Sequence, residues 1–434
     1  MASYRVLIKP SAAREIEAVD QKKGRQRLVA SIRALADEPR PIGSEKLSGQ
    51  CDRYRIRLGR YRVVYSIADD DLVVLAVRVA DRKDIYRQAA QRVGAVERRS
   101  VMKAFVVANY GKSGLCAAEV LDPVIGARDV LVRVSAASIN PLDKMVRNGE
   151  LKLLLKYKTP FVLGHDVAGV VARVGAEVRD YKVGDEVYAR PRDLRIGAFA
   201  EYIAIDHADI ALKPSSLTME ESGAVPLVAL AAWQALADLA RVKPGQKVLV
   251  HAGAGGLGST VIQLARHLGA YVATTARGND EEKVRDLGAS EVIDYTKADF
   301  AELLSGYDVV LDSLSGDNLA KSLTVLKPGG LAISVVGPPD AAFAEQVGRP
   351  LLKPVMAMRS RKVRAQARKL GVRYSFFFMR ADGEQLKTLA ALYDAGTLRP
   401  VLDRTFPFDE TLDAMAYVEQ GRAKGKIVVA MPLP

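Results

Sequence analysis

A glycine-rich turn between a short apolar run and a helical pattern constrains the fold of this chain more than any other feature. Residues 247–251 have the sequence KVLVH, residues 253–258 have GAGGLG, and residues 260–268 show the spacing of an amphipathic helix. Strand, G-x-G-x-x-G and helix in this order are typical of the first turn of a parallel sheet that binds a dinucleotide. The sequence therefore predicts a cofactor-binding α/β domain.

The residues of this turn have separate tasks in the predicted site. Gly253 permits the tight turn, Gly255 lets backbone amides approach a diphosphate, and Gly258 allows the helix to pack closely on the strand. The helix N-terminus presents the positive end of its dipole to the diphosphate. We expect the cofactor to contact Gly253, Gly255, Gly256, Leu257 and Gly258.

The end of the next predicted strand, residues 271–275, indicates which dinucleotide binds. A site for NADH carries Asp or Glu there, on the ribose 2′-hydroxyl. This chain has Arg277, and its first acid is Asp280. An arginine suits a 2′-phosphate through paired hydrogen bonds, so we expect NADPH. Lys283 and Tyr295 are further candidates for the same phosphate.

Length and pattern divide the chain into several folded parts, because 434 residues exceed one ordinary core. A β-rich, glycine-punctuated segment at 102–225 predicts an irregular β-barrel. Alternating strands and helices at 226–378 predict a doubly wound parallel sheet of six strands, a Rossmann domain. We assign residues 1–87 to a small α+β module, 88–101 to a linker, and 379–434 to the barrel domain.

Composition excludes several classes of protein. Hydrophobic residues make up 49% and charged residues 26%, which fits a chain that folds throughout. The two cysteines, Cys51 and Cys116, are too few for a disulfide framework or a four-thiolate zinc site. No stretch resembles a signal peptide or a membrane span. We expect a soluble protein of a reducing compartment, the cytoplasm, with no membrane partner.

The net charge of +13 is concentrated near the N-terminus. Residues 1–100 hold 22 Lys and Arg against 13 Asp and Glu, a balance of +9. Arg53, Arg55 and Arg57 alternate along one predicted strand and therefore share a face. Such a row of guanidinium groups repels itself unless a polyanion such as RNA neutralises it. A solvated outer sheet face is the simpler alternative.

Residues 1–87 predict an α+β fold, with helix within 12–36 followed by an antiparallel sheet from the runs at 54–58, 62–67 and 72–79. The order of residues resembles the RelE/ParE toxin superfamily. Its motifs match KLSG at 46–49, YRIRLGRYRVVY at 54–65 and VADRKDIYR at 79–87. In the RelE branch, basic residues and a tyrosine cleave mRNA on the ribosome. The resemblance implies contact with RNA, the ribosome or an antitoxin through this module.

The resemblance also makes five residues candidates for RNA cleavage. They are Arg55, Arg57, Arg62, Arg82 and Tyr86. The first two match the paired basic positions, the third the phosphate clamp, the fourth a second arginine, and the fifth a base-like tyrosine. Many relatives have histidine where this chain has Asp81. Because this acid would oppose phosphate and pair with the neighbouring arginine, we expect RNA binding with weak cleavage.

Residues 102–434 resemble the medium-chain dehydrogenase/reductase superfamily, in its quinone oxidoreductase-like branch. The likeness is carried by SINPLD at 138–143, LGHDVAGV at 163–170, VGDEV at 183–187, the glycine turn, and GKIV at 425–428. The family's first domain is a GroES-like barrel closed by the C-terminal segment. The resemblance therefore implies that residues 399–434 return to pack on the barrel.

The metal ligands of zinc-dependent relatives are missing. Asn140 to Asp143 stand where the first metal cysteine would fall, and His165 alone cannot complete a tetrahedral site. We expect no metal, and a packing or hydrogen-bonding role for His165. The chemistry implied is hydride transfer from NADPH to a quinone or an α,β-unsaturated carbonyl, a small apolar electrophile. Asn140 resembles the family's cleft asparagine near the nicotinamide, and Lys144 is a candidate donor to the substrate oxygen.

Three functions stay open for the whole chain. The first is a reductase with an inert or regulatory N-terminal module, the second a bifunctional toxin and reductase, and the third an RNA-binding protein that keeps a cofactor domain for regulation. We rank them in this order because the glycine turn stands in complete context, whereas the toxin signature is altered at Asp81. Relatives commonly pair through the edge strand of the cofactor sheet. We therefore expect a homodimer through residues 373–379, which include the apolar run FFFM.

Overall fold

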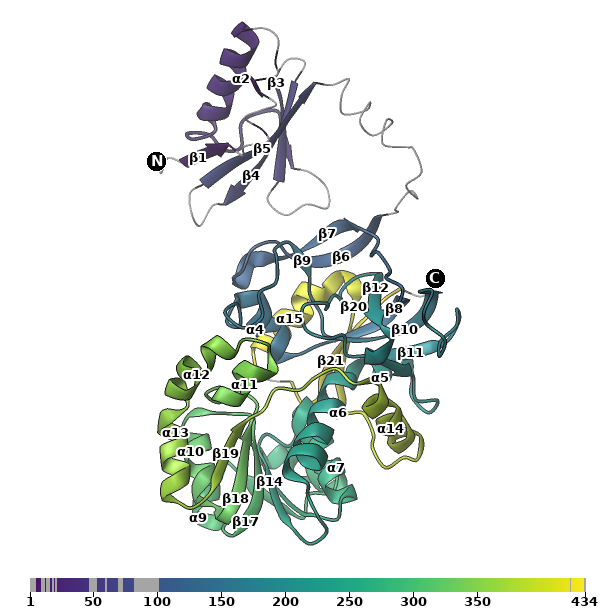
Figure 1. Cartoon of the computed structure of the whole chain (residues 1–434), viewed down its shortest axis with the longest axis vertical. Coiled ribbons are helices and arrows are strands. Elements are labelled where there is room, and N and C mark those ends of the chain that lie inside the picture. The colour runs from purple at the N-terminus through teal and green to yellow at the C-terminus, as the bar shows by residue number, and fades with distance from the viewer. Residues whose placement is uncertain are drawn as a thin grey trace. The chain divides into compact units, whose positions relative to one another are not determined.

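The computed structural model describes residues 5–8, 12, 16–17, 19, 22–46, 53–58, 61–68, 73–81, 101–421 and 423–432. The chain divides into two compact units, Met1–Ala104 with Cys116–Asp122 and Phe105–Leu115 with Pro123–Pro434. Most elements of both units are labelled in Figure 1. The domain boundaries given above stay predictions.

The N-terminal module is a five-stranded sheet with a helix on it. Its elements are β1 (Arg5–Ile8), α2 (Lys22–Ala34), β2 (Ser44–Lys46), β3 (Arg53–Leu58), β4 (Tyr61–Ala68) and β5 (Val73–Asp81). The strand order is β1-β5-β4-β3-β2. The three predicted runs form β3, β4 and β5, which pair antiparallel as expected, whereas β1 runs parallel to β5. No tight turn joins these two strands, so their direction is not forced to be antiparallel.

The core of this module lies between α2 and the middle of the sheet. Leu28 and Ile32, one helical turn apart, are buried against Val63 and Tyr65 of β4, which alternate toward the same face. Helix α2 covers the C-terminal part of the predicted helical region 12–36.

The barrel domain is built from β-strands at both ends of the segment 101–432. Its N-terminal elements are β6 (Val101–Val107), β7 (Leu115–Leu121), β8 (Asp129–Ile139), α4 (Pro141–Asn148), β9 (Phe161–Val162), β10 (Asp166–Val174), β11 (Glu186–Ala189), β12 (Tyr202–Asp206) and β13 (Ile210–Leu212). Its C-terminal elements are β20 (Leu402–Pro407), α15 (Thr411–Glu419) and β21 (Lys426–Ala430). Short 3-10 turns occur at Lys112–Gly114, His207–Asp209 and Phe408–Glu410.

The C-terminal strand returns to the barrel as expected. The main sheet has the order β13-β11-β10-β8-β21-β20, with β12 also paired to β8, and a smaller sheet has the order β7-β6-β9. In the main sheet, β21 runs antiparallel to β8, with Val428 opposite Ser138. The last strand of the chain therefore lies beside the strand that leads into α4.

The cofactor domain is a parallel six-stranded sheet with helices on both faces (Figure 1). Its strands are β14 (Lys247–Val250), β15 (Tyr271–Ala276), β16 (Glu291–Asp294), β17 (Tyr307–Asp312), β18 (Leu326–Ser334) and β19 (Arg373–Phe376). Its helices are α6 (Pro226–Trp233) with a π-helical extension (Gln234–Ala240), α7 (Gly256–His267), α8 (Glu281–Asp286), α9 (Phe300–Leu303), α10 (Gly316–Thr324), α11 (Ala341–Gln346), α12 (Lys353–Arg359) and α13 (Arg361–Lys369). Two further helices, α5 (Met219–Ala224) and α14 (Gly383–Asp394), contact strands of the barrel. Further 3-10 turns are Gly278–Asp280 and Pro350–Leu352.

The strand order places the glycine turn where a ligand is expected. The order is β16-β15-β14-β17-β18-β19. The chain runs outward from β14 through β15 to β16 on one side, and then returns to β17 on the other side of β14. Ligands of open α/β sheets bind at the carboxyl ends of the strands where the order reverses. The predicted six-stranded sheet is confirmed.

The edge strand β19 is shorter than the predicted strand at 373–379. Beyond it, the apolar run packs inside its own chain, because the rings of Phe376 and Phe378 lie 4.8 and 5.1 Å from that of Phe343. Met379 is buried as well. The homodimer through this edge stays a prediction, and the apolar run no longer argues for it. No helix in the described ranges is long and apolar enough to span a bilayer.

Candidate active site

The glycine turn is shaped by close contacts on its inner side. A Cβ atom added to Gly253 would lie 2.1 Å from Thr274 Oγ1, and one added to Gly258 would lie 2.3 Å from the Ala252 carbonyl oxygen. Ala252 itself has a φ of 54°, a left-handed conformation. The turn can therefore form only with hydrogen in place of a side chain at both glycines.

The outer side of the turn is open. A Cβ atom on Gly255 would meet only the Ala252 carbonyl oxygen, at 3.2 Å. Helix α7 starts at Gly256 without a side-chain cap, and its first turn leaves the N–H groups of Gly256, Leu257 and Gly258 without an acceptor inside the helix. This shape and these free donors fit a diphosphate group.

Buried polar contacts hold the turn from behind. His251 Nε2 lies 2.8 Å from Ser322 Oγ, and its Nδ1 lies 3.2 Å from Thr275 Oγ1. The Ala252 N–H donates to the same threonine oxygen at 3.2 Å. Burial lowers the pKa of His251 to about 4, so the ring is neutral at pH 7. His251 is thus a structural support for the turn that the sequence analysis did not single out.

Two predicted phosphate residues meet at the ends of adjacent strands. Arg277 follows β15 and Tyr295 follows β16, and both side chains are exposed. The Arg277 Nε donates a hydrogen bond to the Tyr295 hydroxyl at 2.7 Å. This bond raises the pKa of Arg277 above its ordinary value, so the guanidinium stays charged. The pair forms a cationic, hydrogen-bonding group at the carboxyl ends of β15 and β16, in the same sheet as the strand that leads into the glycine turn.

The third predicted phosphate residue, Lys283, is bonded to the C-terminal segment. Its Nζ donates to the Lys424 carbonyl oxygen, and partial burial lowers the pKa of Lys283. The Lys424 ammonium in turn lies 2.9 Å from Asp280 Oδ1. Asp280, the first acid after β15, is 7% exposed, and this ammonium neutralises its charge. Lys424 is a further cation near this edge that the sequence analysis missed.

Asn140 lies in a buried polar network rather than on an open surface. Its Nδ2 donates to Asp166 Oδ2 at 2.9 Å, and its Oδ1 accepts from the Lys426 ammonium at 2.5 Å. The ammonium also lies 3.2 Å from Asp166 Oδ2. Asn140, Asp166 and Lys426 are 1%, 0% and 5% exposed. Both ends of the Asn140 amide are therefore fixed by the protein itself.

Lys426 connects this network with the glycine turn. Its Cδ would lie 2.7 Å from a Cβ on Gly256, so the lysine stem passes directly beside the first residue of α7. The sequence analysis quoted Lys426 only as part of a family motif. The available signal was a charged residue at the start of an otherwise apolar strand, KIVVA, which is buried throughout most of its length.

His165 makes the hydrogen bond expected of it. Its Nδ1 lies 2.6 Å from Asp143 Oδ1, and both side chains are fully buried. Asp143 also accepts the Asn140 backbone N–H at 2.7 Å, which closes the capping box of α4. His165 Nε2 has no partner within the described part of the chain. Lys144 is half-buried on α4, and its proposed contact with a substrate stays a prediction.

The potential metal ligands do not converge in the described ranges. No group of three or more His, Cys, Asp or Glu side chains there is arranged to hold a metal ion. Asp166, the acid that follows His165, is already compensated by the Lys426 ammonium.

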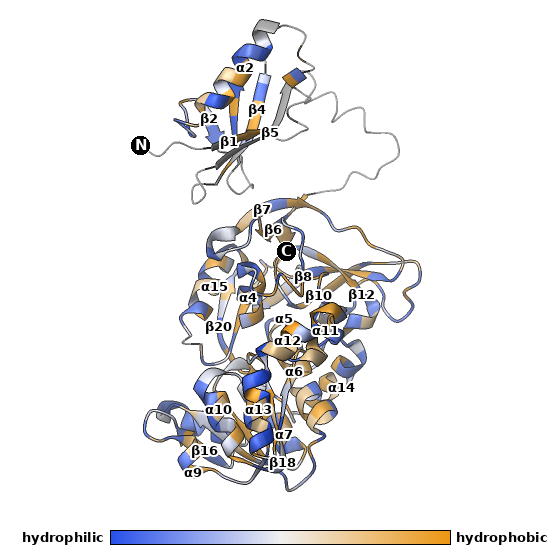
Figure 2. Ribbon diagram, turned by 60° about the vertical axis from the view of Figure 1, so that its left-hand side comes forward, coloured by the Kyte–Doolittle hydropathy of each residue, from blue (hydrophilic) through white to orange (hydrophobic). Residues whose placement is uncertain are grey.

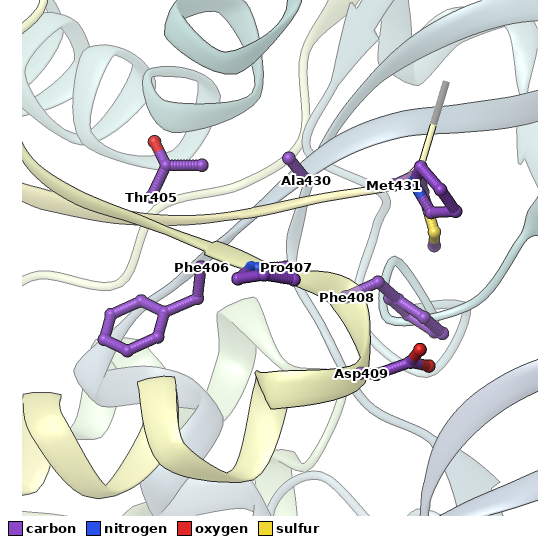
Figure 3. A pocket seen from close by; sticks show the side chains of 8 residues that line it. Thr405, Phe406, Pro407, Phe408, Asp409, Ala430 and Met431 are labelled. Carbon is purple, nitrogen blue, oxygen red and sulfur yellow. The ribbon is translucent and has the colours of Figure 1, made fainter. Parts of the chain in front are cut away.

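Two surface pockets lie in the second unit, apart from these residues. The first, about 430 Å³ in volume and shown in Figure 3, is lined by Thr405, Phe406, Pro407, Phe408, Asp409, Ala430, Met431 and Pro432. The second, about 440 Å³, is lined by Gln263, Arg266, His267, Asp286, Leu287, Gly396, Thr397 and Arg399. Neither includes the glycine turn, Arg277 or the Asn140 network.

The predicted cationic residues of the N-terminal module share one sheet face. Arg57 lies directly opposite Arg62 in the β3–β4 ladder, and Arg55 is two residues from Arg57. The Arg55 guanidinium pairs with Glu45 of β2. The hydrogen bond from Arg55 and the nearby charge of Arg62 lower the pKa of Glu45. An internal carboxylate therefore neutralises part of the row, which the sequence analysis missed because it did not predict β2.

The remaining predicted residues of this module are only partly placed. Asp81 is the last residue of β5 and lies opposite Tyr61. Arg82 and Tyr86 lie outside the described residues.

Three family models match the chain. They are the alcohol dehydrogenase GroES-like domain over residues 126–215, the zinc-binding dehydrogenase domain over 287–429, and the ParE toxin of the type II toxin-antitoxin system parDE over 6–86. The N-terminal match is to ParE toxins, whereas the expectation of RNA cleavage came from the RelE branch.

Individual proteins match over most of the second part of the chain. The tomato (Solanum lycopersicum) 2-methylene-furan-3-one reductase is 35% identical, over 80% of this chain and 83% of that protein. The mitochondrial NAD(P)H oxidoreductase RTN4IP1 of Mus musculus is 34% identical, over 76% of this chain and 90% of that protein. The Arabidopsis thaliana chloroplastic NADPH-dependent alkenal/one oxidoreductase is 35% identical, over 77% of this chain and 80% of that protein.

A solved structure supports the same assignment. The quinone oxidoreductase of Coxiella burnetii superposes with a TM-score of 0.68 and 29% identity, over 77% of this chain and all of that one. The relatives, the barrel closed by β21 and the cofactor sheet agree with one another. The chain belongs to the medium-chain dehydrogenase/reductase superfamily of oxidoreductases and carries a ParE-type module at its N-terminus.

Proposed function

We propose that this chain is a zinc-independent, NADPH-dependent reductase of quinones or α,β-unsaturated carbonyl compounds. The observation that carries the cofactor choice is the Arg277–Tyr295 pair at the ends of β15 and β16. An acid at this place would repel the 2′-phosphate of NADPH, whereas a guanidinium binds it. Relatives named as a 2-methylene-furan-3-one reductase, an alkenal/one oxidoreductase and a quinone oxidoreductase support the substrate class.

The residues present fit the cofactor in its separate parts. The open glycine turn and the uncapped N-terminus of α7 suit the diphosphate, and the alkyl stem of Lys426 packs beside Gly256. Arg277 and Tyr295 suit the 2′-phosphate. Asn140 is held by Asp166 and Lys426, so we propose that it positions the nicotinamide end through this fixed network and not as a mobile side chain.

Bound NADPH supplies a hydride from its nicotinamide ring. In an α,β-unsaturated carbonyl, the β-carbon accepts the hydride, negative charge develops on the oxygen, and a solvent proton reaches the α-carbon. The product is the saturated carbonyl compound. The chain contributes by binding and orienting both molecules and by excluding water. Lys144 remains our candidate for a donor to the developing oxygen charge.

Zinc independence is supported by the chemistry of the donor set. His165 offers one nitrogen, and Asp166 and Asn140 already bind an ammonium group. A divalent ion at this place would compete with that fixed positive charge. The segment Asn140 to Asp143, where the first metal cysteine of zinc-dependent relatives would fall, offers no thiolate, which is the stronger zinc ligand.

The proposal is tested by oxidation of NADPH against a panel of quinones, enones and alkenals, before and after prolonged treatment with a chelator. We expect turnover with at least one of these classes, unchanged by the chelator. Gly255→Val should lose it, whereas a substitution at an exposed surface position such as Lys243→Gln should not. Stoichiometric zinc that is lost together with activity would overturn the metal-free mechanism.

A second candidate function concerns the N-terminal module. Arg57 and Arg62 form a directly opposed pair of cations on one sheet face, which supports binding of RNA or of an acidic antitoxin segment. We expect the full chain to bind RNA with an affinity that falls steeply with salt, and Arg57→Gln with Arg62→Gln to weaken it without changing reductase kinetics. Binding that is unchanged in this variant would exclude this face as the RNA-binding surface.

We further propose cytoplasmic residence and homodimerisation through the edge of the cofactor sheet.

A further inference from the structure

From the end of α11 to just beyond β19, the cofactor domain carries a segment of one charge sign. Residues 346–381 contain no Asp or Glu. Within this segment, residues 359–369 carry six cationic side chains, and all six are exposed. They are Arg359, Arg361, Lys362, Arg364, Arg368 and Lys369. None of the six forms an ion pair in the described part of the chain, and Figure 2 shows hydrophilic residues along α13. Unpaired like charges at this density repel one another unless an anionic partner covers them.

Exposed apolar side chains directly precede these cations. Leu351, Val355 and Met358 are 92%, 43% and 69% exposed. Their spacing of four and three residues places them on one face, along the 3-10 turn and α12 that follow each other without a break. Large apolar side chains in a row on a surface mark a contact site.

The opposite side of the segment is anchored in the domain. Val363 and Ala367 of α13 are buried in the core cluster beneath the sheet, and Gln366 donates to the Ala320 carbonyl oxygen at 3.2 Å. The exposed cations and apolar side chains therefore sit on a fixed support. Their exposure is not that of a frayed end.

We propose that residues 349–369 form a peripheral docking surface for an anionic phospholipid membrane. A row of apolar side chains followed by a cationic helix matches the boundary of a bilayer, where acyl chains lie beneath negatively charged headgroups. Long Arg and Lys side chains can place their charges at the phosphates while apolar neighbours enter below them.

Other occupants fit this surface less well. A second copy of the chain would bring the same cations against themselves. RNA would neutralise the cations but leave the apolar row in water. This proposal departs from the expectation, drawn from the sequence, that the chain has no membrane partner. It does not depend on the reductase assignment, although a bilayer is where apolar quinones and enones dissolve.

The test uses the full chain and sucrose-loaded vesicles that sediment with whatever they bind. We expect binding to phosphatidylcholine vesicles that contain phosphatidylglycerol to exceed binding to pure phosphatidylcholine by about tenfold or more, and to weaken as salt shortens the Debye length. The charge variant carries Arg361→Gln, Arg364→Gln and Arg368→Gln. The apolar variant carries Leu351→Ser, Val355→Ser and Met358→Ser. Each should lose most of the binding.

A matched variant controls for net charge. Arg173→Gln, Lys182→Gln and Lys243→Gln remove three exposed cations elsewhere in the same unit, and this variant should bind as the original chain does. Unchanged thermal unfolding, followed by the fluorescence of the single tryptophan, Trp233, shows that each variant is folded.

Several results would overturn the proposal. One is the absence of vesicle binding, and another is equal binding to both vesicle types. A third is undiminished binding by the charge variant, which would assign the effect to the basic N-terminal module. RNA binding that depends on the three arginines, without vesicle binding, would identify the face as a nucleic-acid site. Self-association that disappears in the apolar variant would identify it as a contact between copies.

Discussion

Among single residues, we expect Arg277 to have the most direct effect on cofactor choice. It is exposed at the end of β15 and bonded to Tyr295, so its charge is available to a ligand. We predict that Arg277→Ser raises the KM for NADPH by about 10- to 100-fold, because a charge-assisted hydrogen bond to the 2′-phosphate is lost. The KM for NADH should stay nearly unchanged. Steady-state kinetics with both cofactors measures this. Lys297→Ser, which removes a nearby exposed cation, is the matched control, and an equal loss for both cofactors would contradict the assignment.

Lys426 is important for a different reason, since its charge is buried with that of Asp166. Removing one member of a buried pair leaves the other uncompensated, which costs about 3–5 kcal/mol. We predict that Lys426→Met lowers the free energy of unfolding by about this amount, and that adding Asp166→Asn restores part of it. Denaturant unfolding followed by the fluorescence of Trp233, the single tryptophan, reports on this unit. A double variant as unstable as the sum of its parts would show that the pair is not coupled.

His251 gives the fold a defined sensitivity to acid. Its pKa falls from 6.5 to about 4 on burial. Between these pH values, His251 is protonated in the unfolded chain and neutral in the folded chain. The free energy of unfolding therefore falls as the pH drops from about 6.5 to about 4, by a total of about 3 kcal/mol. We predict that His251→Gln flattens this part of the pH profile, whereas His267→Gln, at an exposed position, does not. A profile with the same slope in all three proteins would contradict the role of His251.

At the scale of elements, the turn between β14 and α7 combines two requirements in six residues. Its inner glycines are needed for packing and its outer glycine for access. We predict that Gly258→Ala, whose Cβ would lie 2.3 Å from a carbonyl oxygen, destabilises the fold by about 1–3 kcal/mol and weakens cofactor binding. Gly255→Ala should keep the stability close to that of the original chain but still weaken binding. Thermal unfolding with and without NADPH separates the two effects, and equal destabilisation by both substitutions would refute this division.

Elements whose formation depends on nearby residues were predictable. The strand β14, the turn and α7 follow one another within about twenty residues, and their pattern identified them. The β-rich segment at 102–225, which holds the barrel strands β10 and β11, was recognised for the same reason. The three-residue β2 and two-residue β9 carry too little pattern to detect, and the parallel pairing of β1 depends on a strand far along the chain.

The same distinction explains the site. Gly253, Gly255 and Gly258 were assigned because their roles are local. The contact between Lys426 and Asn140 joins residues 286 positions apart, and no spacing rule relates them. It became visible only when β21 was found beside β8.

At the scale of the whole molecule, two units with different families share one chain. The matches to the ParE toxin model and to the dehydrogenase models do not overlap. The cofactor and substrate residues proposed above all belong to the second unit, so we expect the reductase chemistry to be complete there. The +9 balance of residues 1–100 and the Arg57–Arg62 pair give the first unit a separate electrostatic character.

The central claim is that the chain transfers a hydride from NADPH to the carbon–carbon double bond of an activated substrate. The most direct measurement is mass and NMR analysis of the product formed from an enone with NADPH deuterated at C4 of the nicotinamide, with the two C4 epimers used separately. We predict that one epimer delivers a single deuterium to the β-carbon, while the α-carbon takes its hydrogen from the solvent and the carbonyl stays intact. Deuterium on the carbonyl carbon of an alcohol product, or none in any product, would contradict the account.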